Sequence, residues 1–404
     1  MAVLLPSESS QHGFSISNII SRFRSKKRSN PQKPSIKSRK QIPQDTRPSL
    51  INSPISLVLP EHQYTLPSLG WTTITFPQLS SHPSASDPSG PHPLQLAYES
   101  LFAASEAFFA LPSSQKSQWK HKLGTEEGWS SVPGEKEFIT LRSLEYCPDI
   151  LREPAKTYWD LMGMYLCTTL SRIGTSLGLN DDELTRFVGP CATMQETDAL
   201  KTATMIRLFR YEGWEEKVVA EPHCDLGLLS VVVGNVPGLE VWDGHDWFDV
   251  EREVQRAGMK GASMLVGRQL ELMSNGRYGA GGHRVVSYGV PKLQTTTEKS
   301  ASEASGKQME GSKGTEQEER YRYSIVFVLR THDPIMVDSE KLETSITGKW
   351  ETPMKDITAG KMYEEIRGKH FNINIGIEER EKQRDLVKKR EKEMDMEKKR
   401  GKKD

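Results

Sequence analysis

Cysteine is scarce in this sequence of 404 residues, which has only Cys147, Cys167, Cys191 and Cys224. No two of them form a Cys-x-x-Cys pair, so their spacing argues against a disulfide framework and against a structural zinc site. We interpret them as reduced thiols, which are typical of a cytoplasmic protein.

Long apolar runs are also missing. No run approaches the roughly 20 apolar residues that span a bilayer. The start of the chain, Met1 to Pro6, is too short to be the apolar core of a secretory signal. The sequence therefore predicts no membrane partner.

Net charge is zero, because 54 basic residues balance 54 acidic ones. The balance hides one local excess, since Ser15 to Lys40 contains basic residues and no acids. This stretch has a single aromatic residue, Phe23, and lacks the series of interleaved aromatic side chains that stack on bases, so we expect no nucleic-acid partner. We interpret it as a disordered basic tail; the alternative is an organelle or nuclear address, which would move the protein out of the cytoplasm.

The sequence does contain a series of short strand patterns separated by turn residues. Asp243-Gly244 is a strong hairpin signal between two of them. Strands at this spacing indicate an antiparallel sandwich or barrel, so we expect a mainly β fold with flanking helices. The predicted strands are 71–76, 205–211, 228–233, 238–242, 247–250, 263–266, 283–288 and 321–329.

Helical patterns flank these strands. Apolar residues recur at helical spacing over 94–111 and 154–179, with Pro154 placed in a first turn. Asn180 is predicted to cap a shorter helix that ends at Phe187. A short helix is predicted over 361–367. The last stretch, 378–403, is polar nearly all round, which predicts a solvated helix or a disordered tail.

His223 and Asp225 are two positions apart, and a further histidine, His283, follows. In an extended strand, residues i and i+2 point to the same face, so an imidazole and a carboxylate can reach one ion while Cys224 points away. Two histidines and one carboxylate match the facial triad of non-haem Fe(II) oxygenases, which leaves coordination positions open.

Arg322 and Ser324 repeat the i, i+2 spacing on a later predicted strand. Arginine presents a planar fork that grips a carboxylate, and the serine hydroxyl adds a third donor. The pair is therefore predicted to hold an anionic co-substrate beside the metal.

With these residues in order, the sequence resembles the 2-oxoglutarate and Fe(II)-dependent dioxygenase superfamily, in the branch that includes isopenicillin N synthase. The resemblance extends over most of 69–334, and its most specific segments are His223-Cys224-Asp225, His283-Arg284-Val285 and Arg322-Tyr323-Ser324.

The resemblance implies a distorted double-stranded β-helix, or jelly roll, with the metal inside one end. It implies Fe(2+) bound by His223, Asp225 and His283, with 2-oxoglutarate and O2 as co-substrates. Arg322 and Ser324 would bind the distal carboxylate of 2-oxoglutarate, and Tyr211 falls where the family often has a tyrosine that contacts the co-substrate.

The sequence departs from the family pattern in its spacing. Arg322 follows His283 by 39 positions instead of about ten, and a polar stretch at 292–319 accounts for the excess. A disordered loop of this length closes at a modest entropic cost. Phe209 and Glu212 stand where relatives often carry asparagine and proline.

The chain is accordingly expected to divide into five parts with polar, disordered ends. These are a disordered basic tail at 1–55, a helical substrate-side region at 56–195, a jelly-roll core at 196–335 that includes the disordered insertion at 292–319, a C-terminal helical extension at 336–376 and a charged tail at 377–404.

The resemblance implies an oxygenase that hydroxylates or desaturates a small organic molecule, and we expect it to be a monomer. Two alternatives stay open. One is an isopenicillin N synthase-type oxidase, in which the arginine and serine hold the carboxylate of the substrate and no 2-oxoglutarate is used. The other is a binding or regulatory module on a metal-bearing jelly roll. Phe138, Thr140, Arg142 and Arg207 are candidates for the substrate pocket, although each is more readily explained as structural.

Overall fold

The computed structural model describes residues 45–76, 91–122, 125–213, 215–289, 321–370 and 372–400, with side chains described as far as residue 389. The insertion predicted at 292–319 and the predicted tail as far as residue 44 lie outside these ranges. Residues 45–55 of that tail are described, and Arg47 donates hydrogen bonds to the carbonyls of Asn275 and Thr347 at 2.9 and 2.7 Å. The folded part of the chain therefore begins before residue 56.

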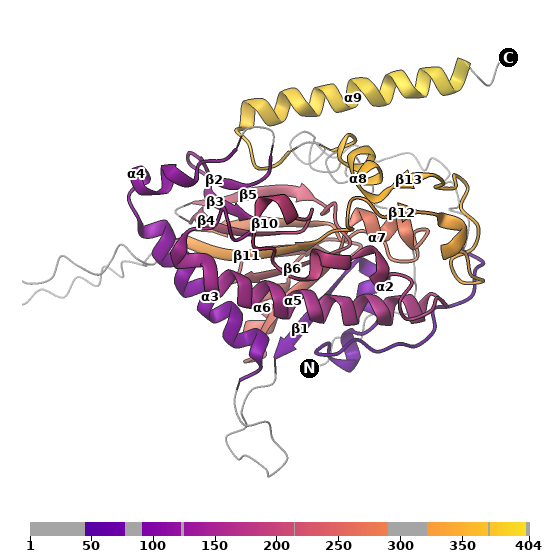
Figure 1. Ribbon diagram of the computed structural model, residues 1–404, viewed down its shortest axis with the longest axis horizontal. Coiled ribbons are helices and arrows are strands. Elements are labelled where there is room, and N and C mark those ends of the chain that lie inside the picture. Colours follow the sequence, from indigo (N-terminus) through magenta and orange to yellow (C-terminus); the bar gives the residue numbers. More distant parts are fainter. Residues whose placement is uncertain are drawn as a thin grey trace, which may run out of the picture.

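Two antiparallel sheets face each other in the centre of the molecule (Figure 1). The seven-stranded sheet has the order β1 (Trp71–Phe76), β9 (Lys260–Val266), β6 (Leu229–Gly234), β11 (Tyr321–Leu329), β4 (Met205–Glu212), β3 (Lys136–Leu141), β2 (Gly128–Val132). The four-stranded sheet has the order β5 (Glu216–His223), β10 (His283–Tyr288), β7 (Leu239–Trp242), β8 (Trp247–Asp249). A small pair, β12 (Met336–Val337) and β13 (Ile357–Thr358), lies apart from them.

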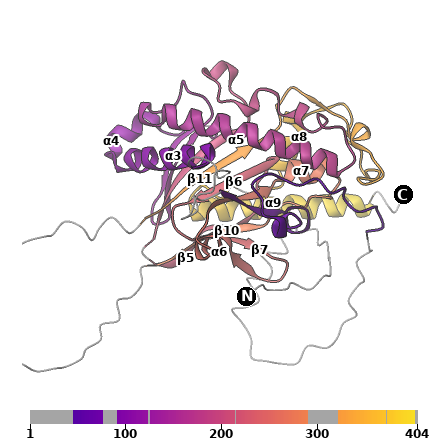
Figure 2. The ribbon, with the colours of Figure 1, turned by 90° about the horizontal axis from the view of Figure 1, so that it is seen from below.

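Helices surround this pair of sheets. The long helices α3 (Pro93–Ala110) and α5 (Asp149–Ser176) cover the side of the large sheet that faces away from the small one (Figure 2). The others are α2 (Thr65–Leu69), α4 (Ser113–Lys116), α6 (Val250–Arg256), α7 (Arg268–Met273), α8 (Ala359–Arg367) and α9 (Ile377–Arg400). Within the described ranges, no helix is both long enough and apolar enough to cross a bilayer.

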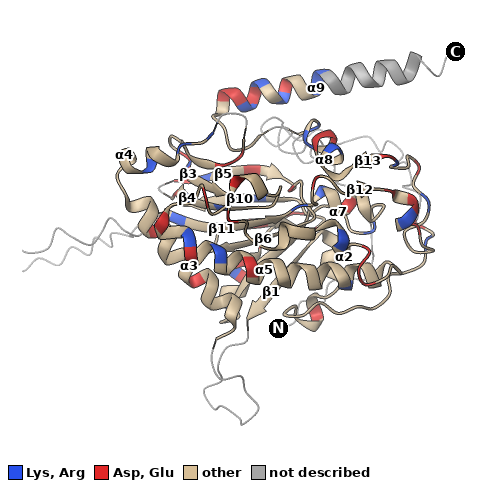
Figure 3. Ribbon diagram, viewed as in Figure 1, with Lys and Arg blue, Asp and Glu red and all other residues tan. Residues whose placement is uncertain are grey.

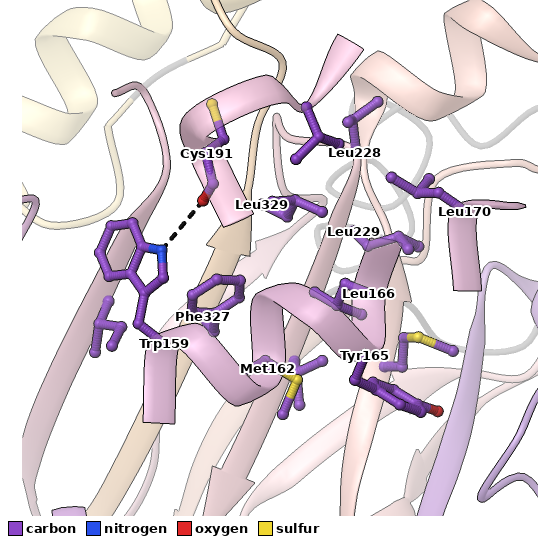
Figure 4. Packing of buried hydrophobic residues seen from close by; sticks show 14 of the residues in the cluster. Trp159, Met162, Tyr165, Leu166, Leu170, Cys191, Leu228, Leu229, Phe327 and Leu329 are labelled. Atoms are coloured by element: carbon purple, nitrogen blue, oxygen red, sulfur yellow. Dashed lines mark hydrogen bonds between the residues drawn. The ribbon is translucent and has the colours of Figure 1, made fainter. Parts of the chain in front are cut away.

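Alternation along the strands divides the interior into two layers. On β11, Ile325 and Phe327 belong to the large apolar cluster that packs under α5, where Trp159 also donates to the carbonyl of Cys191 (Figure 4). The intervening Val326 packs against the second cluster, which lies between the two sheets. Because successive strand residues point to opposite faces, every second residue of the large sheet lines the space between the sheets.

The architecture confirms the predicted jelly-roll class, with mainly β structure and flanking helices. The hairpin predicted at Asp243-Gly244 is present, because β7 pairs with β8 across it. Three strand regions are absent from the predicted series: β5, which contains Pro222, the β2–β3 hairpin, and the small β12–β13 pair, which lies in the segment predicted as a helical extension.

Two helix predictions were wrong in detail. Helix α5 begins at Asp149, so Pro154 lies inside it. A proline there removes one hydrogen bond to the carbonyl of Ile150, whose residue is exposed, so water can replace the lost donor. The capped helix predicted from Asn180 is instead a turn followed by a 3-10 segment, Thr185–Phe187.

Candidate metal centre

The three predicted metal ligands meet at one end of the space between the sheets. His223 is the last residue of β5, Asp225 follows in the loop, and His283 opens β10 directly opposite His223. His223 Nε2 lies 3.8 Å from Asp225 Oδ1, and His283 Nε2 lies 3.9 Å from Asp225 Oδ2. One ligand atom from each residue lies within 4.8 Å of the other two, so a single ion can contact all three.

The main chain orients both imidazoles. The Nδ1 atom of His223 is 2.7 Å from the carbonyl of Glu221, and that of His283 is 3.1 Å from the carbonyl of Gly281. A carbonyl only accepts, so both Nδ1 atoms carry the proton and both Nε2 lone pairs are left for a metal.

The electrostatics of the group also suit a cation. Burial, followed by the neighbouring His283, lowers the pKa of His223, so its imidazole stays neutral. Burial opposes the charge on Asp225, but its pKa nevertheless stays below the usual value, chiefly through the neighbouring His283. Oδ2 of Asp225 is buried and has no hydrogen-bond partner among the described residues. Two imidazoles that present Nε2, together with one carboxylate that has an unused buried oxygen, form a ligand set that fits Fe(II).

Cys224 lies outside this group, as its place between the ligands predicts. Its thiol points toward the carbonyl of Ala280, at 3.7 Å, and the Arg268 guanidinium lies 3.6 Å from the sulfur. Burial raises the pKa of Cys224 to about 11, so the thiol is protonated near neutral pH and is a poor metal ligand.

The three predicted co-substrate residues share the inner face of the large sheet. Arg322 on β11 pairs in register with Tyr211 on β4, and Ser324 pairs with Phe209. The guanidinium carbon of Arg322 is 5.6 Å from the Tyr211 ring centre. Burial raises the pKa of Tyr211 to about 12, against the opposing effects of Arg322 and Ser324. One partner of Arg322 was not predicted: the carboxylate of Glu251, at 2.8 Å.

Among the predicted pocket residues, Phe138, Thr140 and Arg207 also face this interior. Arg207 Nε donates to Thr140 Oγ1 at 2.7 Å, and its guanidinium carbon lies 5.5 Å from the Phe138 ring centre. Arg207 also forms an ion pair with Glu126, at 3.8 Å. The guanidinium of Arg142 donates instead to the main-chain carbonyl of Thr202.

Lys136 is an interior residue that the sequence interpretation missed. It lies in register with Tyr211, on the same face of β3 as Phe138, and is 2% exposed. Period-two alternation from Phe138 would have placed it there. Its amine donates to the carbonyl of Ile373, just before α9. That contact joins residues far apart in sequence, and no local pattern indicates it.

Comparison with known proteins supports the same centre. Residues 203–295, which include all three triad residues and Tyr211, match the model of the 2OG-Fe(II) oxygenase superfamily. No curated protein matches the chain by sequence.

Solved structures share the fold at low sequence identity. A full-length Neurospora crassa protein, in complex with alpha-KG and 5-formyluracil, is 17% identical, with a TM-score of 0.51 over 74% of this chain and 86% of that one. JOX2 in complex with 2OG, Fe and JA is 16% identical, with a TM-score of 0.50 over 75% and 78%. A putative 2OG-Fe(II) oxygenase family protein from Caulobacter crescentus is 17% identical, with a TM-score of 0.50 over 75% and 90%. The family match agrees with the predicted superfamily over residues 203–295, and the solved structures share the predicted jelly-roll fold.

Proposed function

Because the chain carries a domain of the 2OG-Fe(II) oxygenase superfamily, we propose that it oxidises a small organic molecule with Fe(II), 2-oxoglutarate and O2, by hydroxylation or desaturation. The observation that carries the proposal is the convergence of His223, Asp225 and His283, whose ligand atoms lie within 4.8 Å of one another.

Each residue of the triad has a separate task in this proposal. His223 and His283 would bind iron through Nε2, since main-chain carbonyls engage both Nδ1 atoms. Asp225 would add the anionic ligand and complete one face of the ion. The bound iron would supply the redox chemistry, and the protein would supply the geometry around it.

Arg322, Ser324 and Tyr211 would hold the distal carboxylate of 2-oxoglutarate. They share one buried face of the large sheet, and Arg322 and Ser324 are 4% and 2% exposed. Exclusion of water from this face strengthens a charge-assisted hydrogen bond and keeps the reacting centre dry.

The substrate would bind beside the metal, along the inner face of β3 and β4. Phe138 offers an apolar ring there, and the guanidinium of Arg207 is held by Thr140. We expect the enzyme to act as a monomer, and we expect the predicted basic tail at the N-terminus to serve no catalytic purpose.

The decisive experiment measures O2 uptake and succinate release by iron-loaded protein, with and without 2-oxoglutarate. The proposal expects both signals to require 2-oxoglutarate and to vanish in Asp225→Ala, while Cys224→Ser retains them. O2 uptake that depends on a substrate but gives no succinate would favour the isopenicillin N synthase-type alternative. Iron binding without any turnover would favour the binding module.

The substrate can be sought without a candidate in hand. Iron-loaded protein is incubated aerobically with a metabolite extract and 2-oxoglutarate, and the products are compared by mass with those of Asp225→Ala. A gain of one oxygen indicates hydroxylation, and a loss of two hydrogens indicates desaturation.

A further inference from the structure

Arg322 is not a free anion clamp, because the chain places a carboxylate of its own against it. Nη2 of Arg322 lies 2.9 and 2.8 Å from the two carboxylate oxygens of Glu251, at the start of α6. Nε of the same arginine donates to the carbonyl of Val236 at 3.2 Å. Glu251 is fixed in turn by the backbone N–H of Leu239, at 2.8 Å. The two charged side chains are 5% and 12% exposed, so the pair is buried.

Two glycines leave the room that this pair requires. A Cβ on Gly234 would lie 2.4 Å from Glu251 Oε1 and 2.5 Å from Arg322 Nη2. A Cβ on Gly238 would lie 2.6 Å from Arg322 Nε. A larger residue at either position would push the pair apart, so the contact between Arg322 and Glu251 depends on glycine at both positions.

One nitrogen of the guanidinium is left over. Nη1 of Arg322 is buried and has no hydrogen-bond partner among the described residues. A buried donor without an acceptor costs free energy, so an acceptor from a ligand is the natural complement. Ser324, two residues further along the same strand face, offers a hydroxyl as a second donor. A ligand carboxylate would therefore meet Nη1 and this hydroxyl, and could not form the two-point fork that uses Nη2 as well.

We infer that Glu251 determines the affinity of this site for the co-substrate. The Glu251 carboxylate occupies Nη2 of Arg322. The distal carboxylate of 2-oxoglutarate therefore binds only Nη1 of the guanidinium, and it does so beside the negative charge of Glu251. The inference rests on the proposed function and adds to it a specificity-determining residue. It implies that the distal carboxylate contributes little to binding.

The test is calorimetric titration of the iron-loaded protein with 2-oxoglutarate, without O2. Glu251→Gln keeps an oxygen acceptor for Arg322 and for the backbone of Leu239 but removes the charge. The dissociation constant is expected to fall about tenfold, because a like charge near the ligand carboxylate is lost. Glu253→Gln is the matched control: it neutralises an exposed acid of the same helix, which pairs with Arg256, and should leave the constant unchanged. An equal or weaker affinity in Glu251→Gln overturns the inference.

A second titration needs no variant. 2-Oxovalerate has the same carbon chain as 2-oxoglutarate without the distal carboxylate. In the unmodified protein its dissociation constant should exceed that of 2-oxoglutarate by less than about tenfold, because Glu251 already occupies part of the Arg322 guanidinium. A difference of a thousandfold would overturn the inference and leave the proposed function intact. Failure of the protein to bind 2-oxoglutarate at all would overturn both.

Discussion

The side-chain amine of Lys136, inside the barrel, donates a 3.0 Å hydrogen bond to the carbonyl of Ile373, which lies 237 positions further along the chain. Ile373 packs against the apolar cluster between the sheets. The segment that leads into α9 therefore contacts the same interior as Tyr211 and Arg322.

The burial of Lys136 predicts a pH dependence of stability. Burial, only partly offset by Glu135, lowers the pKa of Lys136 from 10.5 to about 7. Between these values the unfolded chain holds a proton that the folded chain has released, so the contribution of Lys136 to stability rises with pH. Thermal unfolding from pH 6.5 to 9.5 should show that Lys136→Met loses this rise.

The comparison uses the difference in Tm between variant and unmodified protein, because other groups titrate in the same range. Lys388→Met, which alters an exposed lysine of α9, should follow the unmodified protein throughout. Parallel pH profiles for Lys136→Met and the unmodified protein would show that Lys136 keeps its charge in the folded state.

Loss of one triad residue should abolish iron binding without loss of the fold. His283→Ala removes one of three ligands, and we expect iron to bind at least about a hundredfold more weakly. Substitution of a residue that only hydrogen-bonds a metal ligand usually has a smaller effect. Iron content after desalting gives the measurement. In the presence of a chelator, His283→Ala and the unmodified protein should have nearly the same Tm. Added Fe(II) should raise the Tm of the unmodified protein and leave that of His283→Ala unchanged. Full iron content in the variant would remove His283 from the site.

The first turns of α9 are predicted to be held by ion pairs. Arg380, which is 3% exposed, contacts Glu135 and Glu221, and Arg384 contacts Glu221 as well. Arg380→Met leaves the Glu135 carboxylate, which is 12% exposed, without its partner, so the free energy of opening this segment should fall by about 3 kcal/mol. Faster amide hydrogen exchange over 377–389 would report the change.

The same experiment has an internal comparison. Lys388→Met removes an exposed ion pair with Asp385 in the same helix, and its effect should stay below about 0.5 kcal/mol. Unchanged exchange in Arg380→Met would mean that packing alone holds the helix.

Local pattern was enough to predict the strands that carry most of the site. On β11, the i, i+2 spacing correctly placed Arg322 and Ser324 on one face, and Tyr211, which was inferred from the family resemblance, pairs in register with Arg322 on β4. The prediction that His223 and Asp225 share a strand was only partly right, because β5 ends at His223. Their side chains still converge, since the loop after β5 turns Asp225 back toward His283.

Other features depend on contacts that no local pattern encodes. Acidic and basic residues are mixed along the described part of α9, which gives no sign of a buried side (Figure 3). Arg380 is nevertheless buried, because its partners come from β5 and the β2–β3 hairpin. Glu251 likewise has the sequence context of a surface helix, and only the fold brings it to Arg322.

Two glycines of α5 allow a matched test of core packing. A Cβ on Gly163 would lie 1.9 Å from the carbonyl oxygen of Ala192, whereas one on Gly174 would meet nothing closer than 3.4 Å. The segment at Ala192 cannot easily withdraw, because Trp159 donates to the carbonyl of Cys191 at 3.1 Å. Gly163→Ala should therefore lower the free energy of unfolding by about 3 kcal/mol through overpacking.

Gly174→Ala should instead raise the free energy of unfolding by up to about 1 kcal/mol. Alanine is more favourable than glycine inside a helix, and the added Cβ displaces no backbone atom. Urea denaturation at a shared m-value measures both variants. The difference in the free energy of unfolding between the two variants tests how closely α5 approaches Ala192. A clash predicts a loss of stability in Gly163→Ala and none in Gly174→Ala. Similar stabilities for the two variants would mean that α5 and the segment at Ala192 lie further apart than the 1.9 Å clash requires.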